Sequence, residues 1–388
     1  MTQHRPRRWQ EVAAQPARIV VGLISGTSMD GIDVAVCRVP AGEPRAVELL
    51  AARTLPWDTA LATRLERAHG ADAAELARLD FEVGHVFADA AAAVLAETGL
   101  RADLVGSHGQ TVYHEHLRTT LQVGEAAVLA ERLGCPVVSD FRRNDIAAGG
   151  CGAPLVPAVD RWLLARPGNG VLALNIGGIS NLTALPPREQ VHRPVIGFDC
   201  GPGNMVLDGL AQRFTGGKAS CDRDGRFAAA GTPDASLLQA LLADPVLNAP
   251  PPRSLGREQY GAPFLDDLLA RRAPAAEQDW HDLFATLAEL TVQAVARAHA
   301  AHVAPFLEVA EVVVAGGGAR NPELLRRLAL ALAPLPVVTS DERGLSSDFK
   351  EAIAFALLAS ARLDGIPGNL PEVTGARRAV LLGKVTES

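Results

Sequence analysis

Residues 20–39 of the chain read V-V-G-L-I-S-G-T-S-M-D-G-I-D-V-A-V-C-R-V. Two apolar runs flank a polar segment, which predicts a β-hairpin with a long tip formed by Ser25, Gly26, Thr27, Ser28, Met29, Asp30, Gly31, Ile32 and Asp33. Its glycines allow the backbone to approach a ligand closely, and its hydroxyls can donate to a phosphate. Its two aspartates would repel a polyphosphate unless Mg²⁺ stands between them. The tip therefore predicts a metal-nucleotide site, although the same residues also suit an ordinary turn.

The common phosphate-binding loops are absent from the sequence. It contains no G-x-x-x-x-G-K-[ST] motif, and no G-x-G-x-x-G motif follows a predicted strand. A nucleotide at the hairpin therefore implies a different fold. At 388 residues the chain exceeds the usual size of one hydrophobic core, so two domains with a cleft between them are expected.

Composition narrows the class of protein further. The chain is 48% hydrophobic and 21% charged, with a net charge of -7 and no basic stripe, which argues against nucleic-acid binding. No run of about 18 apolar residues occurs, so no membrane association is expected. The five cysteines form no C-x-x-C pair, which favours reduced thiols and a cytoplasmic location.

The second half of the chain repeats the opening pattern. A strand at 171–176, a tip with Gly177 and Gly178, and a strand at 182–185 predict a second hairpin. Further on, a strand at 196–198 leads into Asp199, and a strand at 311–315 leads into three glycines. Two helix starts are also predicted. Asn321 is expected to cap a helix whose first residue is Pro322, and Asp348 with Glu351 forms a capping box at the start of another.

Polar clusters follow two apolar segments of the first half. Residues 103–106 form a short strand candidate that ends in His108, Gln110 and Thr111, and residues 137–139 lead into Arg142 and Asp145. Open α/β sheets place their sites at such strand ends. A glycine-rich loop at 147–157 follows, and it either closes over a ligand or is a plain surface loop.

The order of these motifs resembles the actin, sugar-kinase and heat-shock ATPase superfamily. The resemblance implies an α/β, two-domain actin-like ATPase fold, a duplicated ribonuclease-H-like arrangement with an interdomain cleft. The domains are expected at 18–166 and 167–388.

A narrower resemblance covers almost the whole chain. The sequence is similar to anhydro-N-acetylmuramic acid kinases in the segments G-L-I-S-G-T-S-M-D-G-I-D (22–33), G-S-H-G-Q-T (106–111), L-Q-V-G (121–124), D-F-R-R-N-D-I-A-A-G-G-C-G-A-P-L-V-P (140–157), N-I-G-G-I-S-N-L-T (175–183), F-D-C-G-P-G-N (198–204) and A-G-G-G-A-R-N-P (315–322). The chain departs from the family at Cys200, where many members have Thr, and at His116, where Pro is usual. The first is interpreted as a packing change, and the second affects a sugar-facing loop.

The resemblance implies the reaction and the roles of the residues. ATP and water would convert 1,6-anhydro-N-acetylmuramic acid to N-acetylmuramic acid 6-phosphate in peptidoglycan recycling, in a homodimer. Asp199 would be the base that activates water; its alternative role is to cap the following helix. ATP would be held by Gly26 to Asp33, Gly177, Gly178, Gly316, Gly317, Gly318 and Asn321, with Mg²⁺ at Asp30 and Asp33. The amino sugar would be held by His108, Gln110, Thr111, Arg142 and Asp145.

Other interpretations remain open at this stage. Arg142 and Asp145, three residues apart, could simply pair with each other on the surface. His108, His114 and His116 could form a zinc site with Glu115. The chain could also be an ordinary sugar kinase, or an ATP clamp of the chaperone type.

Overall fold

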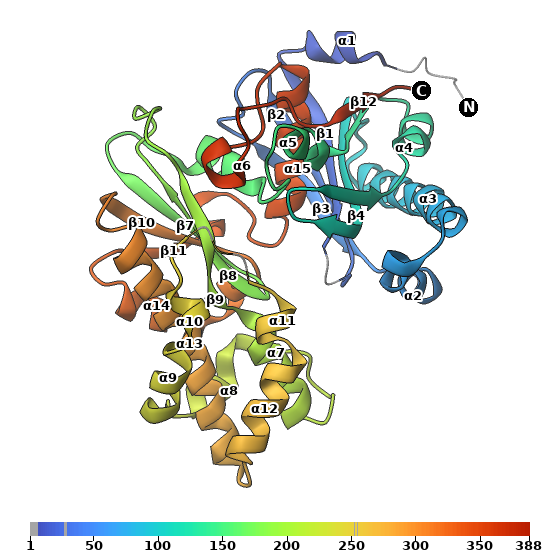
Figure 1. Cartoon of the computed structure of the whole chain (residues 1–388). Helices are drawn as coiled ribbons and strands as arrows, with labels where there is room; N and C mark the ends of the chain where they lie inside the picture. The colour runs from blue at the N-terminus through green and yellow to red at the C-terminus, as the bar shows by residue number, and fades with distance from the viewer. Residues whose placement is uncertain (1–6, 27–28, 252, 254) are drawn as a thin grey trace. The chain divides into compact units, whose positions relative to one another are not determined.

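The computed structural model describes residues 7–26, 29–251, 253 and 255–388, which fall into two compact units (Figure 1). The first unit combines Met1–Leu163 with Phe349–Ser388, and the second is Leu164–Asp348. The first boundary lies close to the expected one. The last forty residues differ from the expectation, because they return to the first unit instead of completing the second.

The sheet of the first unit has a mixed topology. Its strand order is β12-β6-β4-β1-β2-β3, with β5 paired to β4. β1, β2 and β3 form an antiparallel meander, while β4 and β6 run parallel to β1. The bounds are β1 (Ala17–Ser25), β2 (Ile32–Pro40), β3 (Glu48–Leu55), β4 (Leu104–Glu115), β5 (Thr119–Val123), β6 (Val137–Ser139) and β12 (Lys384–Thr386).

The sheet of the second unit repeats this topology. Its order is β11-β10-β7-β8-β9, in which β7, β8 and β9 form the meander and β10 and β11 run parallel to β7. The bounds are β7 (Gly170–Ile176), β8 (Ile179–Leu185), β9 (Ile196–Pro202), β10 (Val309–Ala315) and β11 (Val337–Thr339). The predicted duplication of an α/β unit is therefore confirmed by strand order and direction.

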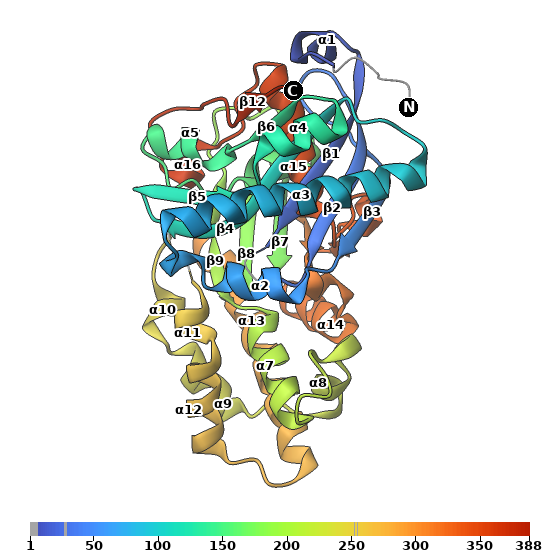
Figure 2. The ribbon, with the colours of Figure 1, turned by 90° about the vertical axis from the view of Figure 1, so that its right-hand side faces the viewer.

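Alternate residues of β1 face different helices. Val21 and Leu23 belong to a buried cluster with Val83 and Phe87 of α3 (Ala73–Thr98), which crosses the sheet in Figure 2. Gly22 points the other way, since a Cβ there would lie 1.8 Å from the backbone oxygen of Ala352 in α15 (Lys350–Leu363). Because side chains alternate along a strand, α3 and α15 cover opposite faces of the sheet. The unit also contains α1 (Trp9–Ala13), α2 (Thr59–Glu66), α4 (Ala126–Leu133), α5 (Phe141–Ala147), α6 (Val156–Leu164, whose last residue belongs to the second unit) and α16 (Pro371–Thr374).

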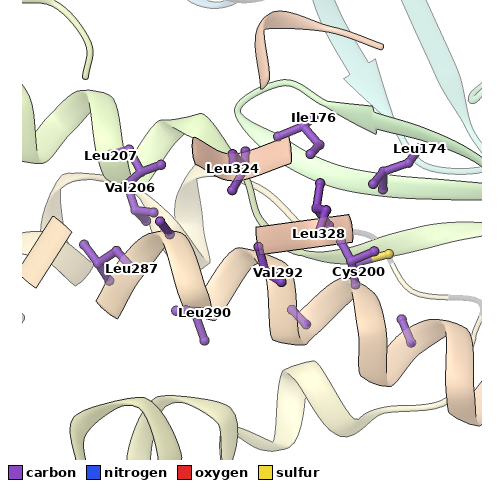
Figure 3. Packing of buried hydrophobic residues seen from close by; sticks show 14 of the residues in the cluster. Leu174, Ile176, Cys200, Val206, Leu207, Leu287, Leu290, Val292, Leu324 and Leu328 are labelled. Carbon is purple, nitrogen blue, oxygen red and sulfur yellow. The ribbon is translucent and has the colours of Figure 1, made fainter. Parts of the chain in front are cut away.

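The core of the second unit forms around one long helix, α13 (Glu277–His302). Leu287, Leu290 and Val292 of this helix are buried in one cluster with Leu174 of β7 and Leu328 of α14 (Pro322–Ala331) (Figure 3). Burial of such side chains contributes about 1.5–3 kcal/mol each. The other helices are α7 (Asn204–Phe214), α8 (Arg226–Ala230), α9 (Ala235–Leu242), α10 (Pro245–Asn248), α11 (Arg257–Tyr260) and α12 (Ala262–Arg272).

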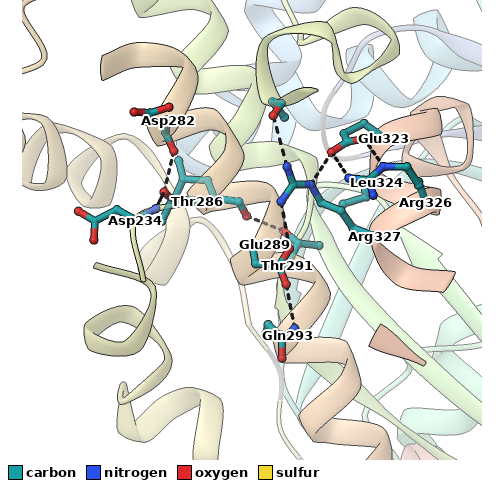
Figure 4. A network of polar contacts seen from close by, with 12 residues as sticks. Asp234, Asp282, Thr286, Glu289, Thr291, Gln293, Glu323, Leu324, Arg326 and Arg327 are labelled. Atoms are coloured by element: carbon teal, nitrogen blue, oxygen red, sulfur yellow. Dashed lines mark hydrogen bonds and ion pairs between the residues drawn. The ribbon is translucent and has the colours of Figure 1, made fainter. Parts of the chain in front are cut away.

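A buried arginine joins three helices of this unit. Arg327 of α14 donates to Glu323 at 2.7 Å, to Glu289 of α13 at 3.1 Å and to the backbone oxygen of Ala228 in α8 at 3.4 Å (Figure 4). Its guanidinium is thus neutralised and hydrogen-bonded within the core. This contact fixes the helix that begins directly after the triple-glycine turn.

The two predicted helix starts have different outcomes. Asn321 is the N-cap of α14 and accepts from the Leu324 amide at 3.0 Å, with Pro322 in the first position, as predicted. The capping box at Asp348 is wrong, because α15 begins at Lys350 with Phe349 as its N-cap. Asp348, the last residue of the second unit, instead forms an ion pair with Arg320 at the end of the glycine turn.

Over the part of the chain that the structure describes, the search for a helix able to cross a membrane gives none.

Candidate active site

The tip of the β1–β2 hairpin is partly described. Thr27 and Ser28 lie outside the described residues. Met29 has a positive φ of 56° and donates its amide to the Gly26 carbonyl at 3.1 Å, so the chain turns sharply here. Asp30 is exposed, whereas the side chain of Ile32 is fully buried in the core, so only its backbone could serve a ligand.

Contacts from neighbouring strands hold this tip in place. Asp33 accepts from the Thr54 hydroxyl at 2.6 Å, and Trp57 donates to the Ser25 hydroxyl at 3.1 Å. Gln110 donates its amide to the Gly26 carbonyl at 3.4 Å. The base of the tip is therefore tied both to β3 and to β4, which pre-organises its position.

The polar cluster at 107–111 lies inside a strand and not beyond its end. β4 continues to Glu115 because it leaves β1 and pairs with β5, with a register shift after Leu23 and a positive φ of 75° at Gly109. The expectation of a short strand ending at residue 106 is wrong for this reason. His108 and Gln110 are consequently buried, while Thr111 is half-buried and accepts from Gln122 at 3.2 Å.

Buried His108 forms a pair with half-buried Arg142. Arg142 donates through Nε to His108 Nε2 at 2.9 Å and through Nη1 to the Gly152 carbonyl at 3.0 Å. His108 Nδ1 then carries the proton and faces the Gly109 carbonyl at 3.0 Å, since arginine can only donate. Burial, and secondarily the charge of Arg142, holds the pKa of His108 well below its usual value. Both ring nitrogens are engaged, which is incompatible with His108 as a zinc ligand.

Asp145 is fully buried and joins the glycine-rich loop to the end of the chain. One carboxylate oxygen accepts from the Gly152 amide at 2.8 Å, and the other accepts from Asn369 and Thr374, each at 2.7 Å. Arg142 and Asp145 therefore bind the carbonyl and the amide of the same residue, Gly152, and do not form the surface pair that their spacing permits. Asp145 acts on the shape of the loop, because it exposes no atom to a sugar.

Two buried polar atoms stand close to this network. The Ser107 hydroxyl and the Gln110 carbonyl oxygen have no hydrogen-bond partner among the described residues. Such atoms cost about 1–3 kcal/mol when they stay unpaired, so a polar ligand or a water at this strand would relieve the cost.

In the second unit, three backbone segments converge. The amides of Gly203 and Asn204 donate to the carbonyls of Gly178 and Gly177 at 2.9 and 2.7 Å, which joins the β7–β8 tip to the start of α7. The glycine turn approaches the same tip, since a Cβ on Gly316 would lie 2.8 Å from the Ile176 carbonyl. A Cβ on Gly318 would lie 2.5 Å from the side chain of Ile176. Main-chain groups and a helix N-terminus thus meet here, which is the chemistry that suits phosphate groups.

Asp199 lies on β9 and is held by the chain that follows α10. Its carboxylate accepts from the Leu255 amide at 2.7 Å, and Arg253 donates to its backbone oxygen at 2.5 Å. It is paired across the ladder with Asn181, close to the β7–β8 tip. The N-cap of α7 is Gly203, so the alternative in which Asp199 caps that helix is wrong. Asn321, expected at the nucleotide, uses its side-chain oxygen to cap α14.

The two departures from the family pattern have separate settings. Cys200 is fully buried in the core of the second unit, in agreement with a packing change. His116 reaches the glycine-rich loop, where its Nε2 lies 3.5 Å from the Cys151 sulfur. Among the residues described, no group of three or more His, Cys, Asp or Glu side chains is arranged to hold a metal ion.

Three residues of interest received no site role in the sequence analysis. Arg253 stacks over Phe198 at 5.1 Å while it holds Asp199, and it lies in a proline-rich segment that gave no motif. Lys350 forms a buried ion pair with Asp160 at 2.7 Å. Glu351 lies within electrostatic range of Arg142 and the β1–β2 tip. For Lys350 and Glu351, the only signal in the sequence was their position directly after a predicted helix start.

A duplicated meander sheet, glycine hairpins at the start of each unit and a glycine turn at the start of a late helix define the class of actin-like ATPases and sugar kinases. Within that class, the family model for anhydro-N-acetylmuramic acid kinase matches residues 18–388. The chain belongs to the anhydro-N-acetylmuramic acid kinase family.

Curated relatives agree with this assignment. The anhydro-N-acetylmuramic acid kinase of Caldanaerobacter subterraneus subsp. tengcongensis is 40% identical over 385 residues, covering 95% of this chain and 97% of that protein. The protein of the same name from Streptomyces coelicolor is 44% identical over 376 residues, covering 95% and 93%. Among solved structures, the ROK hexokinase from Thermus thermophilus matches at 17% identity with a TM-score of 0.36, covering 86% of this chain and 97% of that one.

Proposed function

We propose that the protein is an ATP-dependent kinase that opens 1,6-anhydro-N-acetylmuramic acid with water and phosphorylates oxygen 6, giving N-acetylmuramic acid 6-phosphate and ADP in peptidoglycan recycling. The observation that carries the proposal is Asp199, a carboxylate anchored by the Leu255 amide beside the glycine tip of the second unit. It occupies the position at which the family motif has its catalytic aspartate.

The nucleotide is assigned to main-chain groups. Gly177 and Gly178 carry no side chains, so the backbone of the β7–β8 tip can approach phosphates closely, and Gly316 to Gly318 supply a side-chain-free surface for the adenosine. In the first unit, the segment from Gly26 to Asp33 is also assigned to phosphates. Asp30 and Asp33 fit a hydrated Mg²⁺, because they offer oxygen ligands and Asp30 is exposed; Mg²⁺ bound there would neutralise phosphate charge.

The sugar is assigned to the network on β4 and α5. Arg142, oriented by His108 and Gly152, is placed to hold the lactyl carboxylate, and Thr111 and Gln110 to accept or donate to hydroxyl and N-acetyl groups. Asp145 and His108 act as positioning residues, because their polar atoms are already engaged within the protein.

The reaction follows from these placements. Asp199 takes a proton from water, whose oxygen bonds to carbon 1 of the sugar while the bond from carbon 1 to the bridging oxygen breaks. The bridging oxygen stays on carbon 6 and accepts the γ-phosphoryl group, and ADP leaves. One carboxylate is sufficient, because the phosphoryl group takes the place of the general acid that an inverting glycosidase needs.

Labelled water tests this proposal. With ¹⁸O water, label should appear on carbon 1 of the product and not in the transferred phosphoryl group, and the α-anomer should form first. Rapid NMR and mass analysis measure both. Label in the phosphoryl group, a β-anomer as first product, or faster turnover of N-acetylmuramic acid than of its anhydro form would indicate an ordinary sugar kinase instead.

We further propose that the enzyme works in the cytoplasm as a homodimer, by analogy with its family. Its net charge of -7 and cysteine pattern support a cytoplasmic protein without a nucleic-acid partner. Sedimentation equilibrium of the full chain gives the oligomeric state directly, and a monomer at micromolar concentration would contradict it.

A further inference from the structure

A cavity of the first unit is lined by positively charged side chains without acidic neighbours in its lining. Its volume is about 460 Å³, within the usual range for small-molecule sites. It is lined by Asn144, Ala147, Ala148, Arg362, Arg377, Arg378, Val380 and Leu381. Three of these residues are arginines and none is acidic. This concentration contrasts with the chain as a whole, which is negatively charged.

The three arginines lack acidic partners. Within the described ranges, none of the three guanidinium groups has a carboxylate oxygen within 4.0 Å, whereas many other arginines of the chain do. The nearby Asp364 is engaged by Arg18, and Asp145 is engaged by Gly152, Asn369 and Thr374. Like charges gathered without a counter-charge repel one another, so an anion in the cavity would be favourable.

The arginines are held by backbone contacts that leave part of each guanidinium available. Arg362 donates through Nε to the Gly383 carbonyl at 3.0 Å, and Arg378 donates through Nη1 to the Ala379 carbonyl at 3.4 Å. Arg377 donates through Nη2 to the Ala147 carbonyl at 3.4 Å. Each guanidinium carries five N–H donors in a planar fork, so these single contacts do not use them up.

We propose that this cavity is a binding site for a small organic phosphate. The arginine forks match phosphate oxygens bidentately, and Val380, Leu381, Ala147 and Ala148 supply an apolar wall for the organic part. A cavity of this size accommodates a compact phosphorylated metabolite and not a polymer. The site is separate from the residues assigned to the reaction.

The cavity is mechanically linked to the loop that shapes the proposed sugar site. The Arg377 amide donates to the Ala148 carbonyl at 2.9 Å, and its guanidinium lies against Gly149. Ala147 and Ala148 follow directly on α5, which carries Arg142 and Asp145. A bound phosphate would therefore stiffen the glycine-rich loop, and we expect it to change the KM for the sugar about two- to fivefold.

Calorimetric titration of the full chain with glucose 6-phosphate, in the presence of saturating ADP and Mg²⁺, tests the site. We expect at least a tenfold rise in Kd for Arg378→Ala and a smaller rise for Arg378→Lys, with inorganic phosphate binding more weakly than the sugar phosphate. Arg101→Ala, at another exposed arginine of the same unit, is the matched control and should bind as the unchanged protein does. Saturating 1,6-anhydro-N-acetylmuramic acid, which would fill the proposed sugar site, should leave this Kd unchanged, which separates the cavity from the proposed catalytic site.

The outcomes that overturn the site are equally definite. Equal Kd values for Arg378→Ala and Arg101→Ala, or no heat of binding at millimolar ligand, would reject it. Binding that the anhydro-sugar displaces would place the ligand in the catalytic site. A dimer that dissociates in Arg378→Ala without any phosphate binding would show that the arginines serve contact between copies of the chain. Circular dichroism confirms that each variant is folded.

Discussion

The two sheets share one topology, but the candidate site residues beside them differ in kind: main-chain groups predominate in the second unit and side chains in the first. In the second unit, the β7–β8 tip, the start of α7 and the glycine turn are joined by main-chain hydrogen bonds, with Asp199 as the one carboxylate carried beside them in our assignment. In the first unit, the corresponding region is occupied by hydrogen-bonded side chains, namely His108 and Asp145, which are buried, and Arg142, which is half-buried.

In our assignment, this difference divides one reaction between the two copies of a duplicated scaffold. Main-chain groups and close glycines recognise phosphates, which all nucleotides share, whereas directed side chains recognise the particular shape of a sugar. If this division is right, substitutions in the second unit should change turnover or the KM for ATP. Substitutions in the network of β4 and α5 in the first unit should change the KM for the sugar.

The strongest test is Asp199→Asn. The amide is nearly isosteric, and its oxygen can still accept from the Leu255 amide, so the fold and the affinity for nucleotide should persist. Because it cannot take a proton from water, we expect kcat to fall by a factor on the order of 10³ or more. Steady-state kinetics and a calorimetric Kd for ADP measure the two effects. A loss under about tenfold would remove Asp199 from the role of base.

The glycine turn offers a matched pair of substitutions. Gly316 has a φ of 79°, and a Cβ there would lie 2.7 Å from Asn175 Oδ1 and 2.8 Å from the Ile176 carbonyl. Gly317 has more room, with Asn204 Nδ2 at 3.1 Å. Strain of about 1–2 kcal/mol should raise the KM for ATP roughly tenfold in Gly316→Ala. Gly317→Ala should stay within about threefold. Equal effects of the two would show that the turn does not contact the nucleotide.

Asp145→Asn probes the side-chain network of the first unit. An amide has one acceptor oxygen where the carboxylate serves three donors, so at least one buried donor loses its partner. We expect a loss of about 1–3 kcal/mol in the free energy of unfolding, measured in urea, and a rise in the KM for the sugar with the KM for ATP unchanged.

Asp140→Asn is the control for Asp145→Asn. Asp140 pairs with Lys384 at 2.8 Å and with Arg143 at 3.3 Å near the surface, where such pairs contribute about 0–1 kcal/mol. If Asp145→Asn raised the KM for ATP as well as the KM for the sugar, the proposed division of roles between the two units would be wrong.

The smallest expected effect is a pH dependence. The pKa of His108 in the folded protein lies well below 6.5, so the unfolded chain binds its proton first as the pH falls. The free energy of unfolding should therefore decrease below about pH 6.5, by at most about 1.4 kcal/mol per pH unit from this residue. His108→Gln should reduce that slope and raise the KM for the sugar. His69→Gln, at an exposed histidine, should leave the KM for the sugar unchanged, and a pH slope in His108→Gln equal to that of the unchanged protein would contradict the assignment.

The sequence alone determined what depends on neighbouring residues. Alternating apolar residues and glycine tips predicted the hairpins, and Asn321 with Pro322 predicted the start of α14. Asp72 and Gly99 mark the two ends of α3 in the same way, through an N-cap hydrogen bond and a left-handed C-cap. Such features need only local backbone geometry, which a short stretch of sequence specifies completely.

Tertiary structure decided the rest. β4 runs through residues 107–111 because β5 offers a second partner. Asp348 forms an ion pair with Arg320 instead of capping α15. His108 meets Arg142 across 34 residues, and Asp145 meets Thr374 across 229. The final forty residues pack on the first sheet, where Gly22 leaves room for α15. These contacts form only when distant segments pack together, and their free energy depends on burial and on which donors remain unpaired, which no local pattern encodes.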